Sequence, residues 1–205
     1  AGSVFGALTR AANGEPQNMA INTFKTGGLV LDSLRQSCGL SWDEVEKTIA
    51  ETPPGNNGQG MIGLFQPEIS PRTERPHIRY YGGLRPGEAP SELRALAEFM
   101  ALQRWYYSFW MGPSPQGYLA TGGGAKSRVL LQIDADVSGA EIHVIGECAA
   151  TVNGGCLRGL HSLGHSYEEL LPIHCPRRGE PIRPKNVAAY DKLKSNFASE
   201  MQAAL

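Results

Sequence analysis

The sequence feature that most constrains the fold is a run of three glycines, Gly122–Gly124, between an apolar segment and a helical pattern. The segment before it, Tyr118–Ala120, has the length and composition of a short strand. After it, apolar residues recur at roughly helical spacing: Val129, Leu130, Ile133 and Val137. This order predicts a strand, a glycine turn and then a helix that begins near Ala125 or Lys126.

Such a turn has the properties of a phosphate-binding site. Glycine takes backbone angles closed to other residues and lets the chain pass close to a ligand. The first turn of the following helix offers unpaired N–H groups and the positive end of the helix dipole. The turn is therefore a candidate site for a phosphate-bearing ligand.

The turn matches neither of the two common phosphate-binding patterns. Ala125 stands where a P-loop has the glycine before Lys126-Ser127, and Ser127 stands where the dinucleotide fingerprint has its last Gly or Ala. Glu141 and Glu147 lie downstream at distances that leave a dinucleotide site, and hence a dehydrogenase, open as an alternative. The other alternative is a plain strand-to-helix turn without a ligand.

Charge and composition exclude several classes of protein. The 205 residues include 19 basic and 20 acidic ones, a net charge of −1, whereas a general nucleic-acid binder is plainly basic. No apolar run approaches the roughly 20 residues of a membrane helix, so we expect neither nucleic acid nor membrane as a partner.

The start shows no signal peptide and the four cysteines form no C-x-x-C pair, so we expect a reduced, cytoplasmic protein without a disulfide framework. Because the chain starts with Ala, either the initiator was lost or the chain is part of a longer polypeptide.

The remaining patterns predict an α/β chain with a mixed sheet, treated as one domain over residues 1–205. Strands are expected at 3–8, 17–24, 61–65, 118–120 and 142–145. Helices are expected at 27–36, 42–51, 91–111, 125–138, 149–163 and 187–204. Turn chemistry at 13–16 indicates a hairpin, residues 66–90 are expected to be a surface loop or insertion with a possible strand at 77–81, and residues 172–184 are expected to be a loop.

Three further groups of residues allow more specific expectations. The aromatic stripe of the 91–111 helix is expected in the core, and the glycines of the 149–163 helix are expected to pack closely against another helix, a strand or a bound ligand. His161 and His165 have the spacing of a metal pair, but surface histidines are the better interpretation. Asp134 and Asp136 point to different faces of one helix, so solvated positions are expected rather than a paired acid and base.

Several segments along the chain form a recognisable series: FKTGGL at 24–29, SWD at 41–43, the long helix from Glu92, ATGGGAKSRVLLQIDADVSG at 120–139, IHVI at 142–145 and RGLH at 158–161. Taken in this order, they resemble the C-terminal half of an FGGY carbohydrate kinase, nearest to the eukaryotic xylulose kinase branch. The resemblance covers nearly the whole chain. It implies a ribonuclease-H-like domain of the actin and hexokinase type, a mixed β-sheet flanked by helices, incomplete at its N-terminus.

The resemblance also implies a function and a set of site residues. These kinases use ATP with Mg²⁺, here for phosphorylation of D-xylulose to D-xylulose 5-phosphate. By analogy, Gly122, Gly123 and Gly124 form the nucleotide turn, with Gly123 and Gly124 against the α-phosphate and ribose. Ser127 would contact adenosine, although the eukaryotic pattern usually has Asn there, and Trp42 would line the nucleotide pocket.

The catalytic base and the sugar-binding residues of the family belong to an N-terminal half that this sequence does not contain. The chain therefore has no catalytic residue of its own, and phosphoryl transfer needs groups on both sides of the phosphate. We expect the partners to be nucleotide, the missing half and, through it, a sugar, and we expect the chain alone to be inactive. A kinase for another sugar or polyol, or a non-catalytic nucleotide-binding or scaffolding module, are the alternatives.

Overall fold

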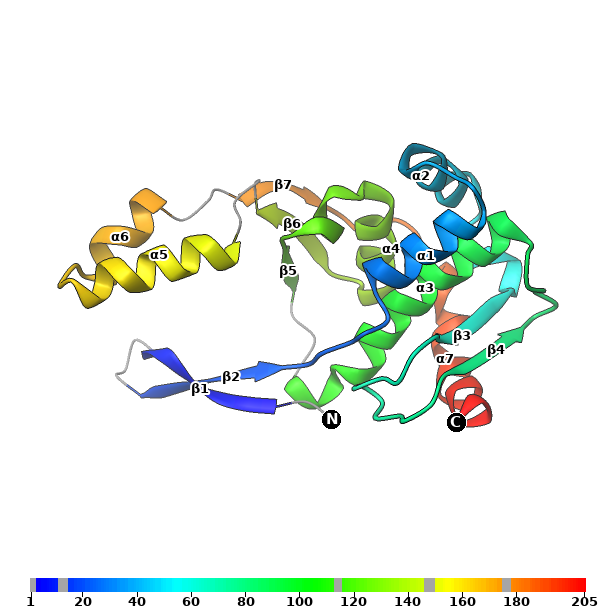
Figure 1. Ribbon diagram of the computed structural model, residues 1–205, viewed down its shortest axis with the longest axis horizontal. Coiled ribbons are helices and arrows are strands. Elements are labelled where there is room, and N and C mark those ends of the chain that lie inside the picture. The colour runs from blue at the N-terminus through cyan, green and yellow to red at the C-terminus, as the bar shows by residue number, and fades with distance from the viewer. Residues whose placement is uncertain (1–2, 11–14, 113–115, 146–149, 175–177) are drawn as a thin grey trace. The chain divides into compact units, whose positions relative to one another are not determined.

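The computed structural model describes residues 3–10, 15–112, 116–145, 150–174 and 178–205. Its contacts divide the chain into two compact units (Figure 1). Unit 1 combines residues 1–114 with residues 186–205, and unit 2 consists of residues 115–185. Unit 2 is thus an insertion in the sequence of unit 1, and the single domain expected over residues 1–205 stays a prediction.

The core of unit 1 forms where helix α3 (Ala89–Tyr107) packs against strand β3 (Gly60–Leu64). All of β3 is buried, and so is every position of α3 from 92 to 103. The predicted core role of the aromatic stripe is confirmed for Phe99, which is 1% exposed. It is wrong for Phe109 and Trp110, which leave the helix in a short 3₁₀ turn and are exposed.

Three further elements complete this layer around α3. Strand β4 (His77–Tyr81) pairs antiparallel with β3, while helices α1 (Gly28–Ser37) and α2 (Trp42–Glu51) pack on α3. β4 lies within the predicted 66–90 loop, where a strand at these positions was considered possible. The arginines of this segment are exposed, as expected of a solvated surface: Arg72, Arg75, Arg79 and Arg85.

Local sequence signals explain how two helices of unit 1 begin. The predicted capping box of α2 is confirmed, because the Ser41 hydroxyl accepts the Glu44 amide and the Glu44 carboxylate accepts the Ser41 amide. The N-cap of α3 was predicted at Ser91 and is wrong by three residues, because the N-cap is Glu88. The helix begins at Ala89, with Pro90 in its first turn, where the missing N–H of proline costs nothing.

Helix α7 (Val187–Ala204) spans the range predicted for the last helix and returns the chain to unit 1, where it packs on β3 and β4. Its buried face consists of Tyr190, Leu193, Phe197 and Met201. Figure 1 shows this segment in red beside the two strands. The aromatic contact between Phe197 and Phe99, with ring centroids 6.2 Å apart, joins α7 to α3.

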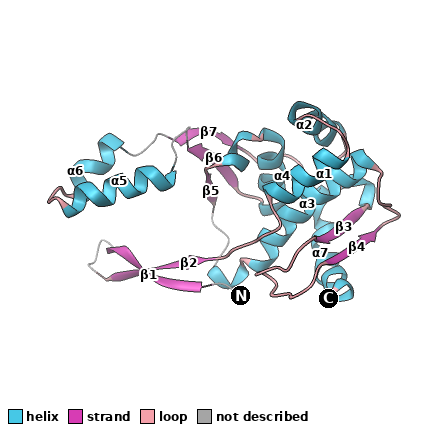
Figure 2. Ribbon diagram, viewed as in Figure 1, coloured by secondary structure: helices cyan, strands magenta, loops and turns pink. Residues whose placement is uncertain are grey.

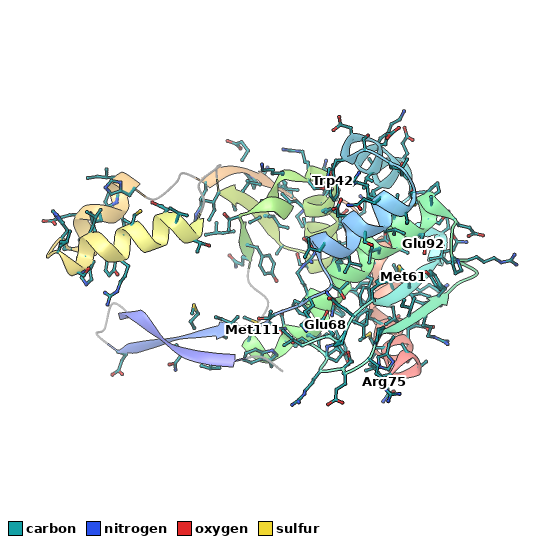
Figure 3. All side chains as sticks on the ribbon, viewed as in Figure 1. Trp42, Met61, Glu68, Arg75, Glu92 and Met111 are labelled. Atoms are coloured by element: carbon teal, nitrogen blue, oxygen red, sulfur yellow. The ribbon has the colours of Figure 1, made fainter. Side chains whose placement is uncertain are left out.

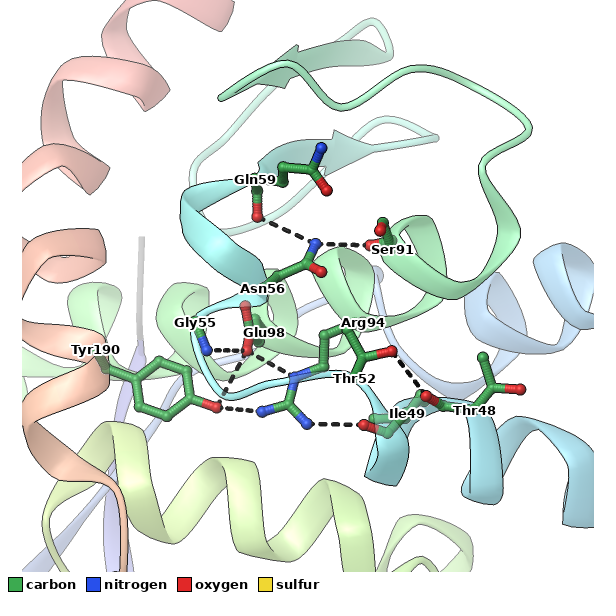
Figure 4. A network of polar contacts seen from close by, with 10 residues as sticks. All are labelled: Thr48, Ile49, Thr52, Gly55, Asn56, Gln59, Ser91, Arg94, Glu98 and Tyr190. Atoms are coloured by element: carbon green, nitrogen blue, oxygen red, sulfur yellow. Dashed lines mark hydrogen bonds and ion pairs between the residues drawn. The ribbon is translucent and has the colours of Figure 1, made fainter.

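A buried polar network also joins α7 to α3 (Figure 4). Arg94 Nε donates to Glu98 Oε1 at 2.7 Å, and the same oxygen accepts the Gly55 amide at 2.8 Å and the Tyr190 hydroxyl at 3.1 Å. Arg94 also donates to the Tyr190 hydroxyl and to the carbonyl of Ile49. Burial raises the pKa of Glu98, although Arg94, Gly55 and Tyr190 act in the opposite direction. The charged residues of α3 are therefore buried because they have partners from three other segments.

The chain begins with a hairpin of strands β1 (Ser3–Arg10) and β2 (Pro16–Ile21). The strands pair antiparallel, with Phe5 opposite Met19. The hairpin predicted for this region is confirmed. The turn residues Asn13 and Gly14 lie outside the described residues.

Unit 2 is built on a three-stranded mixed sheet in the order β5-β6-β7 (Figure 2). Strand β5 (Gly117–Ala120) is parallel to β6 (Glu141–Ile145), and β7 (Arg178–Ile182) is antiparallel to β6. Helix α4 (Arg128–Ser138) covers the sheet with a small apolar core: Leu131, Ala135, Ile142 and Ile182. The predicted mixed sheet is confirmed. The predicted loop over 172–184 is wrong at β7, whose glycine and proline gave no strand signal.

Helices α5 (Ala150–Ser162) and α6 (Tyr167–His174) contact each other in unit 2. Close packing of the α5 glycines against another helix or a strand is not found among the described residues, because a Cβ built on Gly154, Gly155 or Gly159 meets no described atom within 4 Å. None of the helices expected from the sequence covered α6. Cys148, Ala149 and Cys175, which entered the predictions for this region, lie outside the described residues.

Candidate functional site

The predicted strand, glycine turn and helix are present in unit 2, with one difference. Gly122 has a φ of +82°, a conformation that L side chains rarely adopt. The next four residues, Gly123–Lys126, form a 3₁₀ turn, closed by a hydrogen bond from the Ala125 amide to the Gly122 carbonyl. Helix α4 therefore begins at Arg128, not at Ala125 or Lys126 as predicted.

The glycine turn presents bare backbone to its surroundings. Gly122, Gly123 and Gly124 are exposed, and a Cβ built on any of them meets no described atom within 4 Å. The amides of Gly123 and Gly124 open the 3₁₀ turn, and the first amides of a helical segment have no acceptor within it. An anionic group could therefore approach these amides without displacing a side chain.

Ser127, predicted to contact a ligand, has a structural role as well. It is the N-cap of α4, and its hydroxyl oxygen accepts the Leu130 amide at 3.2 Å. Capping occupies the oxygen as an acceptor but leaves the hydroxyl hydrogen free to be donated. Ser127 lies at the same end of α4 as the glycines and is half-buried.

Two cations next to the glycines were not singled out from the sequence. Lys126 ends the 3₁₀ turn and Arg128 begins α4, and both are exposed. Within the described part of the chain, neither has an ion-pair partner. Together with the open amides they make this end of α4 favourable for a negatively charged ligand. The signal in the sequence that could have identified them is that one stands directly before Ser127 and the other directly after it.

Trp42, the remaining predicted site residue, belongs to unit 1. It is the first residue of α2 and is 47% exposed (Figure 3). The Arg35 guanidinium lies over its ring, with Cζ 5.3 Å from the ring centroid. Of the predicted site residues, the structure therefore brings together Gly122, Gly123, Gly124 and Ser127 at one turn, while Trp42 is on a different unit.

A buried carboxylate, Glu68, also went unrecognised in the sequence. Its side chain accepts the amides of Lys25 at 2.7 Å, Thr26 at 2.8 Å and Ile69 at 2.7 Å, and the residue is 3% exposed (Figure 3). Burial raises the pKa of Glu68, but the backbone hydrogen bonds outweigh it, so the pKa is lowered from its ordinary value. Glu68 thereby fixes the segment that leads into α1.

Asp136 corrects the expectation that both aspartates of α4 are solvated. It is 2% exposed, and its Oδ1 accepts the Lys185 amide at 2.6 Å and the Gln132 side chain at 3.0 Å. Asp136 therefore fixes the chain where unit 2 ends. Asp134 is only partly buried and raises the pKa of Tyr118, for which burial is the larger cause.

The described residues support no metal site. His161 Nδ1 is 2.9 Å from the carbonyl oxygen of His165, and its ring stacks on Tyr167 at 4.1 Å. Nowhere in the described ranges do three or more His, Cys, Asp or Glu side chains gather as metal ligands would. Among the same residues, no helix combines the length and apolarity needed to cross a membrane.

No protein-family model matches the chain, but individual relatives do. Xylulose kinase of Rattus norvegicus is 30% identical over 166 residues, which is 76% of this chain and 31% of that protein. Xylulose kinase of Mus musculus is 31% identical over 169 residues, which is 77% of this chain and 30% of that protein. The chain thus spans about a third of the length of these curated relatives.

The comparisons with solved structures concern the fold. The structure of ligand-bound xylulose kinase from Lactobacillus acidophilus aligns with a TM-score of 0.80 at 16% identity. The alignment covers 98% of this chain and 44% of that chain. The structure of Plasmodium falciparum glycerol kinase with ADP aligns with a TM-score of 0.72 at 18% identity. The alignment covers 98% of this chain and 42% of that chain. The fold is that of the carbohydrate kinases of the actin-like ATPase type, as predicted.

Within that class, the sequence relatives are xylulose kinases. The predicted resemblance to the FGGY carbohydrate kinases, in their xylulose kinase branch, is therefore confirmed.

Proposed function

We propose that this chain supplies the nucleotide-binding part of a kinase that transfers the γ-phosphoryl group of ATP to a sugar. The observation that carries the proposal is the open glycine turn between β5 and α4. Its exposed amides at Gly123 and Gly124, with Lys126 and Arg128 beside them, suit the phosphates of a nucleotide. In this proposal Ser127 donates its hydroxyl to the nucleoside.

D-Xylulose, converted to D-xylulose 5-phosphate, is the acceptor that we propose first, because the sequence relatives are xylulose kinases. A second candidate is a kinase for another sugar or polyol. It is a candidate because kinases with other acceptors share the fold: the alignment with a gluconate kinase of Lactobacillus acidophilus covers 98% of this chain with a TM-score of 0.77. The acceptor would be bound by residues outside this chain, which has no proposed catalytic residue.

Mg²⁺ enters this proposal only as part of the Mg·ATP substrate. Among the described residues, no three His, Cys, Asp or Glu side chains lie together as ligands for it. What this chain's residues do is hold the nucleotide: the glycine amides receive the phosphates, and the two cations offset part of their charge. Turnover then needs a group that accepts the proton of the sugar hydroxyl, supplied from elsewhere.

Calorimetric titration tests the binding step. ADP and ATP with Mg²⁺, and NAD in parallel, are titrated into the protein and into its Gly123→Val variant. We expect adenine-nucleotide binding that Gly123→Val abolishes, because the branched side chain would stand between the phosphates and the amides. Saturable NAD binding without ADP binding would overturn the proposal in favour of a dehydrogenase, and binding of neither would overturn it for this chain.

The acceptor requires a second assay with the full-length protein. ADP release is measured with D-xylulose, gluconate and glycerol at equal concentrations. We expect D-xylulose to give the highest kcat/KM. A preference for one of the other two would replace the proposed acceptor and leave the nucleotide site standing. A full-length protein that binds ATP but phosphorylates none of a wider panel would favour a non-catalytic module.

A further inference from the structure

The turn that leads from helix α2 into strand β3 has a left-handed backbone. Its residues, 55–58, all have positive φ: +78° at Gly55, +48° at Asn56, +54° at Asn57 and +80° at Gly58. Among the described residues, the two asparagines are the only non-glycine residues with positive φ. Such a backbone is costly for a residue with a side chain, and it persists only where surrounding contacts enforce it.

Asn56 supplies contacts that hold this left-handed turn (Figure 4). It is fully buried, and its Nδ2 donates to the carbonyl of Ser91 at 2.8 Å and to the carbonyl of Gln59 at 3.2 Å. The amide of Gly55 donates to the Glu98 carboxylate at 2.8 Å. The turn is therefore anchored to the first turn of α3 and to the buried polar network.

Asn57 is the member of the turn that is open to chemistry. It is exposed to solvent, and so is the next residue, Gly58. An asparagine before a glycine is prone to deamidation, because glycine has no side chain to obstruct attack by its backbone nitrogen. In this reaction the Gly58 nitrogen bonds to Cγ of Asn57, and the side-chain amide takes up the proton that this nitrogen loses and leaves as ammonia. Water then opens the five-membered ring to give aspartate or isoaspartate.

The closed turn holds this reaction back. The Gly58 nitrogen is engaged, because it donates to the Gly55 carbonyl at 2.8 Å. It must leave that acceptor to reach Cγ of Asn57, so the turn has to open first. Local opening costs less free energy than global unfolding, and the contacts that keep a segment closed set the population of its open form. The hydrogen bonds of Asn56 should therefore control the rate.

We propose that Asn57 is a site of spontaneous deamidation whose rate is set by opening of the left-handed turn. The inference concerns unit 1 alone and is independent of the proposed function. Isoaspartate adds a methylene group to the main chain between residues 57 and 58. The Gly58 carbonyl has no room to shift, because it packs so closely on Gly82 that a Cβ there would clash with it. The isoaspartate product therefore cannot rebuild the turn.

The test follows the uptake of heavy oxygen from isotopically labelled water. The folded full-length protein is incubated at mildly alkaline pH and digested, and mass spectrometry with fragmentation separates aspartate from isoaspartate. Asn57→Gly removes the reacting amide and suits the positive φ. Asn56→Ala removes the side-chain bonds that close the turn. Glu74→Gln, at an exposed position of unit 1, is the control.

A second Asn-Gly pair among the described residues, Asn153 and Gly154, gives a comparison within the same protein. It lies in helix α5 of unit 2, and Asn153 Nδ2 donates to the His174 carbonyl at 3.1 Å. Because Asn56 belongs to unit 1, Asn56→Ala should leave the rate at Asn153 unchanged. Equal acceleration at Asn57 and Asn153 would indicate global unfolding and overturn the proposed control by the turn.

We expect heavy oxygen at Asn57 in the unmodified protein and in Glu74→Gln at equal rates, and none at this position in Asn57→Gly. We expect uptake about ten-fold faster in Asn56→Ala, because the loss of two hydrogen bonds raises the open population. Equal rates in Asn56→Ala and the unmodified protein would overturn the proposal. So would a folded protein without label at Asn57 under conditions in which the urea-unfolded protein is labelled there.

A second measurement covers the case in which Asn56→Ala does not fold. The rate at Asn57 is then followed in the unmodified protein at urea concentrations below its unfolding transition. A rate that rises with urea supports control by opening of the turn, and a constant rate overturns it.

Discussion

The hydroxyl of Tyr190 and the guanidinium of Arg94 are 2.7 Å apart, although 96 positions separate these residues in the sequence. The same hydroxyl donates to Glu98 at 3.1 Å, so one phenol completes a buried ion pair. The contact is made by the helix that returns to unit 1 after the whole of unit 2 has been traversed.

We expect Tyr190→Phe to lower the free energy of unfolding of unit 1 by about 1–3 kcal/mol, because two buried charged groups lose a hydrogen-bond partner. Urea denaturation followed by circular dichroism measures this. Tyr118→Phe, at an exposed position on β5, is the matched control and is expected to stay within about 0.5 kcal/mol. Equal effects of the two substitutions would contradict a stabilising role of the network.

Glu68 predicts a specific acid sensitivity. Its pKa is lowered in the folded protein, so its contribution to stability is present above the ordinary carboxyl value of about 4.3 and is lost as the pH falls through the lower folded value. Glu68→Gln should cost about 1.5–3 kcal/mol at pH 7, since charge-assisted bonds to backbone amides are weakened. It should also remove part of the stability loss between neutral and acid pH.

The measurement is the urea midpoint at a series of pH values for both proteins. Glu74→Gln, at an exposed position in the same segment, serves as the control and should keep the pH dependence of the unmodified protein. If the curves of the unmodified protein and Glu68→Gln run parallel from neutral to acid pH, Glu68 does not carry the expected contribution.

The glycines of the turn should differ in their tolerance of a side chain. Gly122→Ala forces a Cβ onto a residue with φ of +82° and should destabilise unit 2 by about 1–3 kcal/mol. Gly123→Ala meets open space at an ordinary φ and should change stability by less than about 0.5 kcal/mol. Thermal unfolding of the two variants provides the comparison, and a larger loss for Gly123→Ala would show that the turn has another conformation.

Asp136 should control the end of unit 2. Asp136→Ala removes the acceptor of the Lys185 amide, so that amide should exchange with solvent about ten-fold faster or more if the bond is worth at least about 1.4 kcal/mol. Hydrogen exchange read by mass spectrometry on peptides that contain Lys185 measures this. Glu180→Gln, at an exposed position on β7, should leave the exchange unchanged. Unaltered exchange in Asp136→Ala would mean that another contact protects the amide.

The features that could be predicted from the sequence are those with a local cause. The capping box at Ser41 depends on two residues three positions apart, and the glycine turn depends on consecutive residues, so both were recognisable. α7 and α3 were found because their apolar residues recur at helical spacing. The exact start of α4 could not be predicted, because a 3₁₀ turn and an α-helix share the same short sequence pattern.

The features that were missed depend on residues far apart in the sequence. Glu68 and Asp136 are charged and thus expected at the surface. Amides that are distant in the sequence, those of Lys25, Thr26 and Lys185, help to make their burial favourable. Strand β7 depends on its pairing with β6, which compensates for the low strand propensity of its own residues. The Arg35–Trp42 contact joins two helices, and no one-dimensional pattern indicates it.

The interrupted sequence of unit 1 sets an order on biosynthesis. Residues 115–185 leave the ribosome before α7 does, while the face of α3 that receives Tyr190 and Phe197 is still uncovered. A chain released after residue 185 would therefore carry a finished inserted unit on a host that exposes Phe99 and the Arg94–Glu98 ion pair without the Tyr190 hydroxyl. Quality control that recognises exposed apolar surface would distinguish such a chain from the finished one by its missing last helix.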